Sequence, residues 1–198
     1  MGAILRPATQ RDAEGIARIY APIVSETAIS FETEPPSPDE MRRRIEADGA
    51  RTPWLVCADG ELVWGYACAT GHRTRAAYRW STEVSAYVDA AQRQRGIGAG
   101  LYRALLAILT LQGFHRGHAG ITLPNDASVA LHERVGFTPI GIYREVGYKF
   151  GLWHDVGWWG RTLARPGDPP AEPVAFAEIR SRPEVVAALD DETSLLPS

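Results

Sequence analysis

The stretch Gln94-Arg95-Gly96-Ile97-Gly98-Ala99-Gly100-Leu101 decides how this sequence is organised. It follows an alternating run from Thr82 to Val88, which predicts a strand, and it opens a long apolar helical pattern. Small residues at 96, 98 and 100 let backbone N–H groups approach a ligand closely. Because such donors at a helix N-terminus favour a phosphate, the stretch predicts a pyrophosphate-binding turn.

Several ligands compete for this turn. A Rossmann dinucleotide site needs a third glycine where Leu101 stands and an acidic residue about 20 positions further on, and the sequence has two histidines and an arginine there instead. A P-loop needs a following Gly-Lys-Ser/Thr, which is absent. A glycine turn without any ligand stays open, although Arg93 and Arg95 beside the glycines weaken it. Coenzyme A is the remaining phosphate ligand.

The composition predicts one ordinary globular domain. The chain has 198 residues, 45% of them hydrophobic, and a formal net charge of -3, which gives no general attraction for nucleic acid or anionic lipid. Cys57 and Cys68 are spaced neither as a metal pair nor as a disulfide framework. No apolar run reaches the ~20 residues of a membrane span, and a signal-peptide core is not found. We expect a cytoplasmic protein without a metal.

Strand and helix patterns alternate along residues 1–165. We expect a mixed, mostly antiparallel sheet of about six to seven strands with helices on both faces, an α/β (α+β) fold. Predicted strands are 3–7, 54–58, 62–69, 82–88, 118–122, 140–148 and 156–163, and predicted helices are 11–25, 38–47, 97–112 and 126–135. Beyond Arg165, four prolines between 166 and 173 predict a linker or a surface-lying, flexible tail through 198, with a short helix near 184–190.

Motifs in and around the glycine turn resemble those of the GNAT superfamily of N-acetyltransferases. Arg93-Gln94-Arg95-Gly96-Ile97-Gly98 matches the signature (Gln/Arg)-x-x-Gly-x-(Gly/Ala) of that superfamily. Within it, the chain resembles the phosphinothricin and methionine sulfoximine acetyltransferases from about Leu5 to Leu163. The motifs that carry this similarity are Phe31-Glu32-Thr33-Glu34-Pro35, Tyr87-Val88, Leu123-Pro124-Asn125-Asp126-Ala127-Ser128, Leu131-His132-Glu133-Arg134-Val135-Gly136-Phe137, Gly147-Tyr148-Lys149-Phe150-Gly151 and Trp153-His154-Asp155-Val156-Gly157.

The resemblance implies a site for acetyl-CoA. In that fold the 82–88 strand splays from its neighbour, and the cosubstrate lies in the gap. Asn125 suits both an N-cap and hydrogen bonds to the pantetheine amides. Backbone N–H groups around Tyr87 and Val88 would stabilise the oxyanion if the strand bulges there. The expected cofactor-binding residues are Ala86, Tyr87, Val88, Arg93, Gln94, Arg95, Gly96, Ile97, Gly98, Ala99 and Asn125.

Two residues are candidates for proton transfer. An amine attacks the thioester directly only when it is neutral, and an α-amino group titrates near ~8, so a base must take its proton. Glu83 lies on the strand before the turn, on the same face as Ser85 and Tyr87, and a glutamate there is the proposed base in the resembling family. His132 stands where many GNAT enzymes have a tyrosine that protonates the thiolate. A solvent-facing carboxylate and a surface histidine are the alternatives.

The acceptor site is less sharply marked. An amino acid with an anionic or sulfoximine-like end calls for planar donors, which Arg73 or Arg75 would supply; we select Arg75. Phe31, Tyr78 and Ser85 join Glu83 as candidate substrate-binding residues, and the resemblance places these regions partly at a homodimer interface. Simple solvated arginines and core aromatics remain the alternatives. His154-Asp155 are strand neighbours facing opposite sides, so packing explains them better than a catalytic dyad.

The favoured function is acetylation of the α-amine of a small amino-acid-like molecule such as phosphinothricin, methionine sulfoximine or methionine sulfone. Another small amine or a peptide N-terminus would use the same chemistry. A non-catalytic acyl-CoA-binding module is the alternative from a different class, but such a module needs neither Glu83 nor His132.

Overall fold

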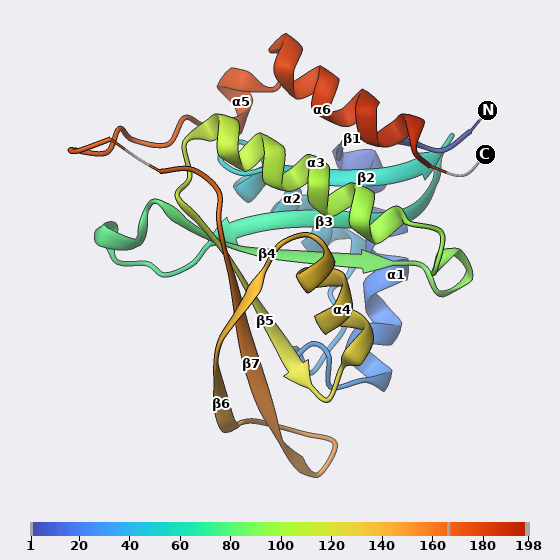
Figure 1. Cartoon of the computed structure of the whole chain (residues 1–198). Helices are drawn as coiled ribbons and strands as arrows, with labels where there is room; N and C mark the ends of the chain where they lie inside the picture. Colours follow the sequence, from blue (N-terminus) through green and yellow to red (C-terminus); the bar gives the residue numbers. More distant parts are fainter. Residues whose placement is uncertain (1, 166, 197–198) are drawn as a thin grey trace.

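A seven-stranded mixed sheet forms the centre of the computed structural model, which describes residues 2–165 and 167–196 (Figure 1). The strand order is β1-β2-β3-β4-β5-β7-β6, and only β4 and β5 are parallel neighbours. This confirms the expected mixed, mostly antiparallel sheet. The strands are β1 (Ile4–Pro7), β2 (Trp54–Asp59), β3 (Leu62–Gly71), β4 (Ser81–Val88), β5 (Arg116–Leu123), β6 (Thr138–Lys149) and β7 (Leu152–Thr162).

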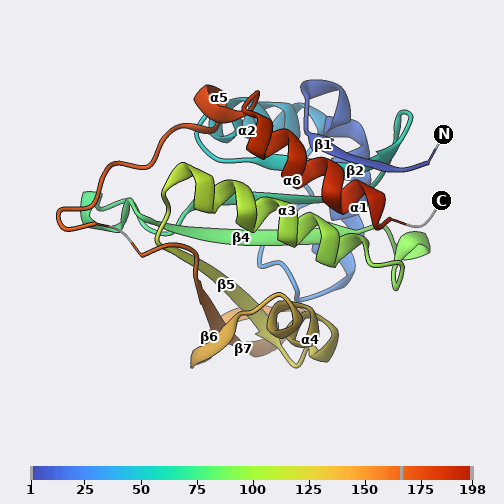
Figure 2. The same ribbon diagram turned by 45° about the horizontal axis from the view of Figure 1, so that its top comes forward.

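Helices cover both faces of the sheet, as expected (Figure 2). α1 (Ala13–Glu26) and α2 (Pro38–Gly49) enclose one apolar cluster with the sheet. α3 (Ile97–Gln112), α5 (Phe176–Ile179) and α6 (Pro183–Ser194) enclose the other, and α4 (Asp126–Arg134) adds Val129 and Leu131 to its edge. Three short 3-10 turns, η1 (Gln10–Asp12), η2 (Ala76–Tyr78) and η3 (Ala90–Gln92), connect these elements. No helix in the described residues is long and apolar enough to cross a membrane.

Local signals place most helix ends correctly. The Ser37 hydroxyl accepts a hydrogen bond from the backbone N–H of Glu40 at 3.2 Å, and Pro38 takes the first helical position of α2. Pro22 lies inside α1 without ending it. The turn η1 replaces the first residues of the helix that was expected to begin at Arg11.

The two parallel strands separate soon after they meet. Pairing of β4 with β5 is confined to Ser81↔Arg116, Thr82↔Gly117 and Glu83↔His118. β4 then continues along β3 to Val88, while β5 continues along β7 to Leu123. The structure therefore contains the splay that the resemblance implied, and Glu83 and His118 stand at the fork.

The segment after Arg165 is more than the flexible or surface-lying tail that its prolines suggested. Phe176, Ile179, Val185 and Leu189 are buried in the same apolar cluster as α3. Pro183 begins α6 rather than interrupting a helix, and the short helix expected near 184–190 extends to Ser194. The reason is that α3 is apolar around most of its circumference, so it needs cover on the side that faces away from the sheet.

Two polar contacts fasten α6 in this position. Arg103 of α3 makes two hydrogen bonds to the Glu192 carboxylate, at 2.7 and 2.6 Å. The Thr193 hydroxyl accepts the backbone N–H of Leu5, on edge strand β1, at 2.9 Å. Helix α6 thus lies over α3 and reaches the sheet edge (Figure 2).

Substitutions at two adjacent valines test this packing of α6. Val185 is 0% exposed and Val186 is 44% exposed. Val185→Ala removes two buried methyl groups and leaves a cavity, so we expect the free energy of unfolding to fall by about 2 kcal/mol. Val186→Ala makes the same change of helix propensity without a cavity and should leave stability unchanged or slightly raised. Equal losses in urea unfolding would contradict the burial of α6.

Candidate functional site

The gap between β4 and β5 joins the two faces of the sheet. It contains a cavity of about 50 Å³. Ser85, Gly120 and Thr122 line it from the face that carries α1 and α2, while Tyr102, Asn125 and His132 reach it from α3 and α4. A group bound above α3 can therefore meet a group bound on the opposite face only through this gap.

The glycine turn has the geometry of an anion site. Gly96 is the N-cap of α3 with φ of 80°, a left-handed conformation that favours glycine, and no side chain caps the helix. The first helical hydrogen bond runs from Gly100 N to Gly96 O at 3.0 Å. The N–H groups of Ile97, Gly98 and Ala99 therefore have no helical acceptor and lie at the positive end of a 16-residue helix.

Neighbouring side chains shape this turn. Gln94 also has a positive φ, 62°, so the chain bends sharply just before Gly96. A Cβ on Gly98 would lie 3.2 Å from a methyl group of Leu131, so glycine lets α4 approach α3. The Arg95 guanidinium lies 4.8 Å from the Trp64 ring centroid and donates to Gln92 Oε1 at 2.5 Å. The Arg95 guanidinium is thus held beside the N-terminus of α3.

β4 presents an open backbone edge to the gap. The N–H of Asp89 donates to Trp64 O, and β4 pairs with β3 in an unbroken register, so by alternation Tyr87 also directs its backbone groups towards β3. The bulge considered for Tyr87 and Val88 is not present in this pairing. Ala86 and Val88 are the residues whose N–H groups face the gap, and the Tyr87 ring packs against Tyr20 and Tyr66.

His132 is buried and lies in a directed hydrogen-bond chain. Its Nδ1 lies 2.7 Å from the Ser128 carbonyl oxygen, and its Nε2 lies 2.8 Å from the Tyr102 hydroxyl. Because a carbonyl only accepts, Nδ1 carries the hydrogen and Nε2 accepts from Tyr102. Burial lowers the pKa of the imidazole, and the bond to the Ser128 backbone offsets this only in part. His132 is therefore a neutral acceptor here, not the free donor that we expected.

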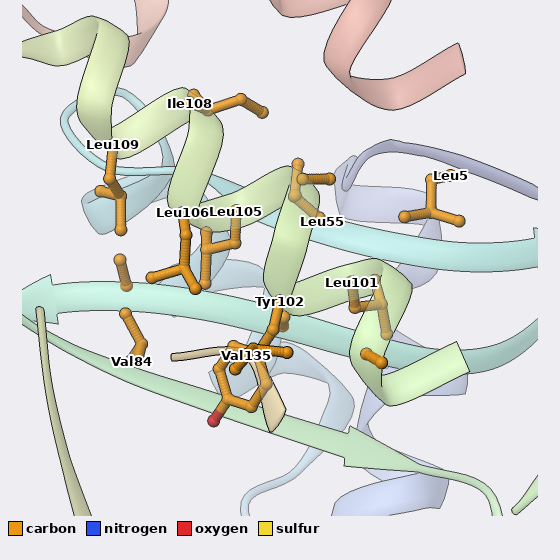
Figure 3. Close-up of a cluster of buried hydrophobic side chains, with 14 of the residues drawn as sticks. Leu5, Leu55, Val84, Leu101, Tyr102, Leu105, Leu106, Ile108, Leu109 and Val135 are labelled. Carbon is orange, nitrogen blue, oxygen red and sulfur yellow. The ribbon is translucent and has the colours of Figure 1, made fainter. Parts of the chain in front are cut away.

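Tyr102 is a site residue that sequence reasoning missed. It extends from α3 into the apolar cluster (Figure 3), and its ring lies near those of His132 and Phe137. Burial raises the pKa of its hydroxyl, and a hydrogen bond from the Ala86 backbone partly offsets that shift. The phenol oxygen is thus bound both to the open edge of β4 and to His132. Its helical position gave no polar signal, because Tyr102 falls among the apolar residues of α3.

Asn125 fulfils the predicted capping role. Its Oδ1 accepts the backbone N–H of Ser128 at 3.2 Å at the start of α4. The amide nitrogen of its side chain is left for a ligand, and Asn125 also lines the cavity.

A second cluster surrounds Glu83 at the fork. His72 Nδ1 lies 2.8 Å from Glu83 Oε1, and Arg73 donates to the same oxygen at 3.2 Å. The His72 ring stacks on His118 with centroids 4.3 Å apart, and Tyr78 lies edge-on at 5.8 Å. Burial, together with His72 and the neighbouring arginines, lowers the pKa of His118 to about 4. Sequence reasoning named Glu83 and Tyr78 but missed both histidines.

The two candidate arginines, Arg73 and Arg75, have different surroundings in the structure. Arg73 contacts Glu83, and its guanidinium lies 5.7 Å from the Trp158 ring centroid. Arg75 is exposed and precedes η2, and its side chain makes no hydrogen bond or ion pair in the described part of the chain. The structure therefore joins Arg73, rather than the selected Arg75, to the cluster.

Phe31 lies in the loop between α1 and α2, against the β6–β7 hairpin. Its ring covers Gly147, where any side chain would overlap it, and lies 6.2 Å from His154. Lys149 ties the same loop to β6 by donating to the carbonyls of Val24 and Ser30, both at 2.7 Å. Through this loop Ile29 reaches the cavity, whereas Phe31 itself is not among the lining residues.

A network of charged groups also holds the loop. The Glu32 carboxylate receives two hydrogen bonds from Arg44, at 2.8 and 3.0 Å, and one from Tyr20 at 3.0 Å. The Arg44 guanidinium lowers the pKa of Glu32. The loop that carries Ile29 and Phe31 is therefore fixed to α1, α2 and β6 at once.

Comparison with known proteins agrees with this geometry. Residues 5–158 match the family model described as an acetyltransferase (GNAT) domain. A phosphinothricin N-acetyltransferase from Streptomyces viridochromogenes is 40% identical over 171 residues, which cover 86% of this chain and 93% of that protein. An L-methionine sulfoximine/L-methionine sulfone acetyltransferase from Pseudomonas aeruginosa is 35% identical over 159 residues, covering 79% and 92%.

Solved structures share the fold. A phosphinothricin acetyltransferase of Sinorhizobium meliloti, in complex with acetyl-CoA, superimposes with a TM-score of 0.78 at 34% identity, covering 88% of this chain and 94% of that one. An N-acetyltransferase of Staphylococcus aureus gives a TM-score of 0.80 at 30% identity, covering 83% and 100%. The chain therefore belongs to the GNAT family of acetyltransferases.

Proposed function

We propose that this protein transfers the acetyl group of acetyl-CoA to the α-amine of a small amino-acid-like acceptor of the phosphinothricin, methionine sulfoximine or methionine sulfone class. One observation carries the proposal: the gap between β4 and β5 connects an uncapped helix end on one face with the Glu83 cluster on the other. The names of the relatives support both the cosubstrate and the acceptor class.

The residues on the α3 side fit acetyl-CoA. The pyrophosphate would accept hydrogen bonds from the N–H groups of Ile97, Gly98 and Ala99, with Arg93 and Arg95 balancing its charge. The pantetheine amides would bind Asn125 and the open edge of β4. When bound, acetyl-CoA supplies the acetyl group as an activated thioester.

The chain's own groups would handle the charges that develop. Glu83 serves as the base for the ammonium. The N–H group of Val88 serves as an oxyanion donor, because it faces the gap and has no strand partner, whereas the N–H group of Ala86 is bound to the Tyr102 hydroxyl. The Tyr102 hydroxyl, oriented by His132, faces the thiolate that leaves.

Recognition of the acceptor would come from the face of α1 and α2. Arg73 suits an anionic end group because its guanidinium is already fixed over Trp158. Tyr78 and Phe31 would enclose the aliphatic part, and Ser85 lines the passage to the gap. Arg75, exposed at the start of η2, would contribute only at the outer rim.

Glu83→Gln tests the assignment of the base. Removing the carboxylate while keeping its shape should lower kcat by about 10²- to 10⁴-fold, whereas the Kd for acetyl-CoA should stay nearly constant because Glu83 lies on the opposite face from the helix end. Thiol release with a panel of amino acids and analogues gives kcat, and calorimetry gives Kd.

Glu61→Gln, at an exposed hairpin position, is the matched control and should change neither quantity. A large loss of acetyl-CoA affinity in Glu83→Gln would argue against its role as base. Turnover of peptide or aminoglycoside acceptors alone would overturn the acceptor class, and normal binding without thiol release from any amine would favour the acyl-CoA-binding module.

We also propose that the protein works as a homodimer joined through the β6–β7 hairpin. The hairpin projects from the body of the fold (Figure 1). It exposes large apolar side chains in a density that is unusual for a monomer surface. This hairpin patch consists of Ile140, Ile142, Tyr143, Val146, Tyr148, Phe150, Leu152 and Trp153.

One charge placed in the hairpin patch should separate the subunits. Leu152, 64% exposed, belongs to the patch, and Leu62, 54% exposed, begins β3 away from it. In light scattering we expect the unmodified protein and Leu62→Glu to have the mass of a dimer and Leu152→Glu to have that of a monomer, because an unpaired carboxylate is costly to bury in an interface. A monomeric unmodified protein would contradict the proposal.

A further inference from the structure

Three titratable side chains meet at the fork where β4 and β5 part. Glu83 and His118 are the last paired residues before the strands separate. His72 directly follows the end of β3 and lies against both of them. The cluster sits on the face from which an acceptor would enter the gap, so its chemistry bears on the proposed acetylation and rests on that function.

The His72 ring is held on four sides. Glu83 binds its Nδ1 at 2.8 Å, and His118 stacks on it with the two planes inclined by only 21°. The rings of Tyr78 and Trp158 meet it edge-on, at 70° and 81°. A ring confined in this way has one orientation, which is the condition for acting on a bound substrate.

The hydrogen bond to Glu83 determines which ring nitrogen of His72 can accept a proton. A carboxylate oxygen accepts, so Nδ1 of His72 carries the hydrogen and the neutral ring has its lone pair on Nε2. Nε2 makes no hydrogen bond within the described residues, and the side chain is mostly buried. A carboxylate behind an imidazole orients the ring and stabilises the imidazolium, as in the serine protease triad.

The hydrogen bond to Glu83 distinguishes His72 from His118 as the ring that is set up to take the proton. Within the described residues the His118 ring makes no hydrogen bond or ion pair with a carboxylate, and burial, with His72, Arg116 and Arg73, lowers its pKa to about 4. Two stacked rings cannot both be charged without repulsion, and the ring that is hydrogen-bonded to the Glu83 carboxylate is His72. The charged and titratable groups that face this ring pair are Glu83, Arg73, Arg116 and Tyr78.

We infer that His72 is a catalytic residue: its Nε2, with Glu83 bound behind the ring, accepts the proton that the acceptor ammonium loses before it attacks. The N–H bond of the ammonium breaks and its electron pair stays on the amine nitrogen. A new N–H bond forms at Nε2, and the resulting imidazolium is paired with the Glu83 carboxylate until it passes the proton to solvent. Glu83 thus promotes the deprotonation through His72, by orienting the ring and stabilising its imidazolium, while the proton itself goes to Nε2.

The test compares His72→Asn with His118→Asn. The side-chain amide at 72 can still donate to Glu83 but has no basic lone pair, so we expect kcat to fall by about 10²- to 10⁴-fold with unchanged acetyl-CoA affinity. The acid limb of kcat/KM should also move up to the titration of the acceptor's own amine, because only the neutral amine can then react. His118→Asn removes a histidine from the same stack and should change kcat by much less than about 10²-fold, the bottom of that range.

Chemical rescue separates catalysis from folding. Added imidazole should restore turnover to His72→Ala in proportion to its concentration, and it should not restore turnover to Glu83→Gln. Turnover by the unmodified protein together with an unimpaired His72→Asn, or failure of rescue in a variant that binds acetyl-CoA normally, would overturn this inference alone. Absence of turnover with every amine would overturn the proposed function and this inference together.

Discussion

The early separation of β4 from β5 is the constraint on which the rest of the structure depends. Two strands that part inside a protein leave backbone donors and acceptors without a ladder, and burying such groups unpaired is costly. On the side of α3, the Tyr102 hydroxyl satisfies part of this need, because it binds the β4 backbone and His132. The N–H group of Val88 has no strand partner in the described pairing. A ligand in the gap would accept its hydrogen bond, as a neighbouring strand would.

The same separation explains why both halves of the site are rigid. Helix α3 must hold its N-terminus at the gap, and it is clamped between the sheet and α6 by apolar contacts and by the Arg103–Glu192 pair. On the other face, Lys149 and the Glu32–Arg44 pair fasten the loop that carries Ile29.

Local patterns predicted the fold well, together with several of its turns and helix caps. The Gly96 turn, the Ser37 cap and the Asn125 cap are signals carried by a few adjacent residues, and each is present in the structure. The Glu83 cluster was only partly predictable. His72 and His118 are 46 residues apart in the sequence, and the register of the strands brings them together. A single sequence does not reveal that register. The orientation of His132 likewise depends on Tyr102, whose place in an apolar helical stripe made it look like ordinary core.

The groups that suit acetyl-CoA and the groups on the acceptor face come from different parts of the sequence. The groups that suit acetyl-CoA come from one continuous stretch, β4 through α4, where the helix end, the open strand edge and Asn125 are locally determined. The groups on the acceptor face come from the α1–α2 loop, the segment after β3, β5 and the β6–β7 hairpin. The groups that suit the acetyl donor are therefore set by local sequence, whereas groups on the acceptor face, the stacked pair His72 and His118 among them, meet only through the pairing of distant segments.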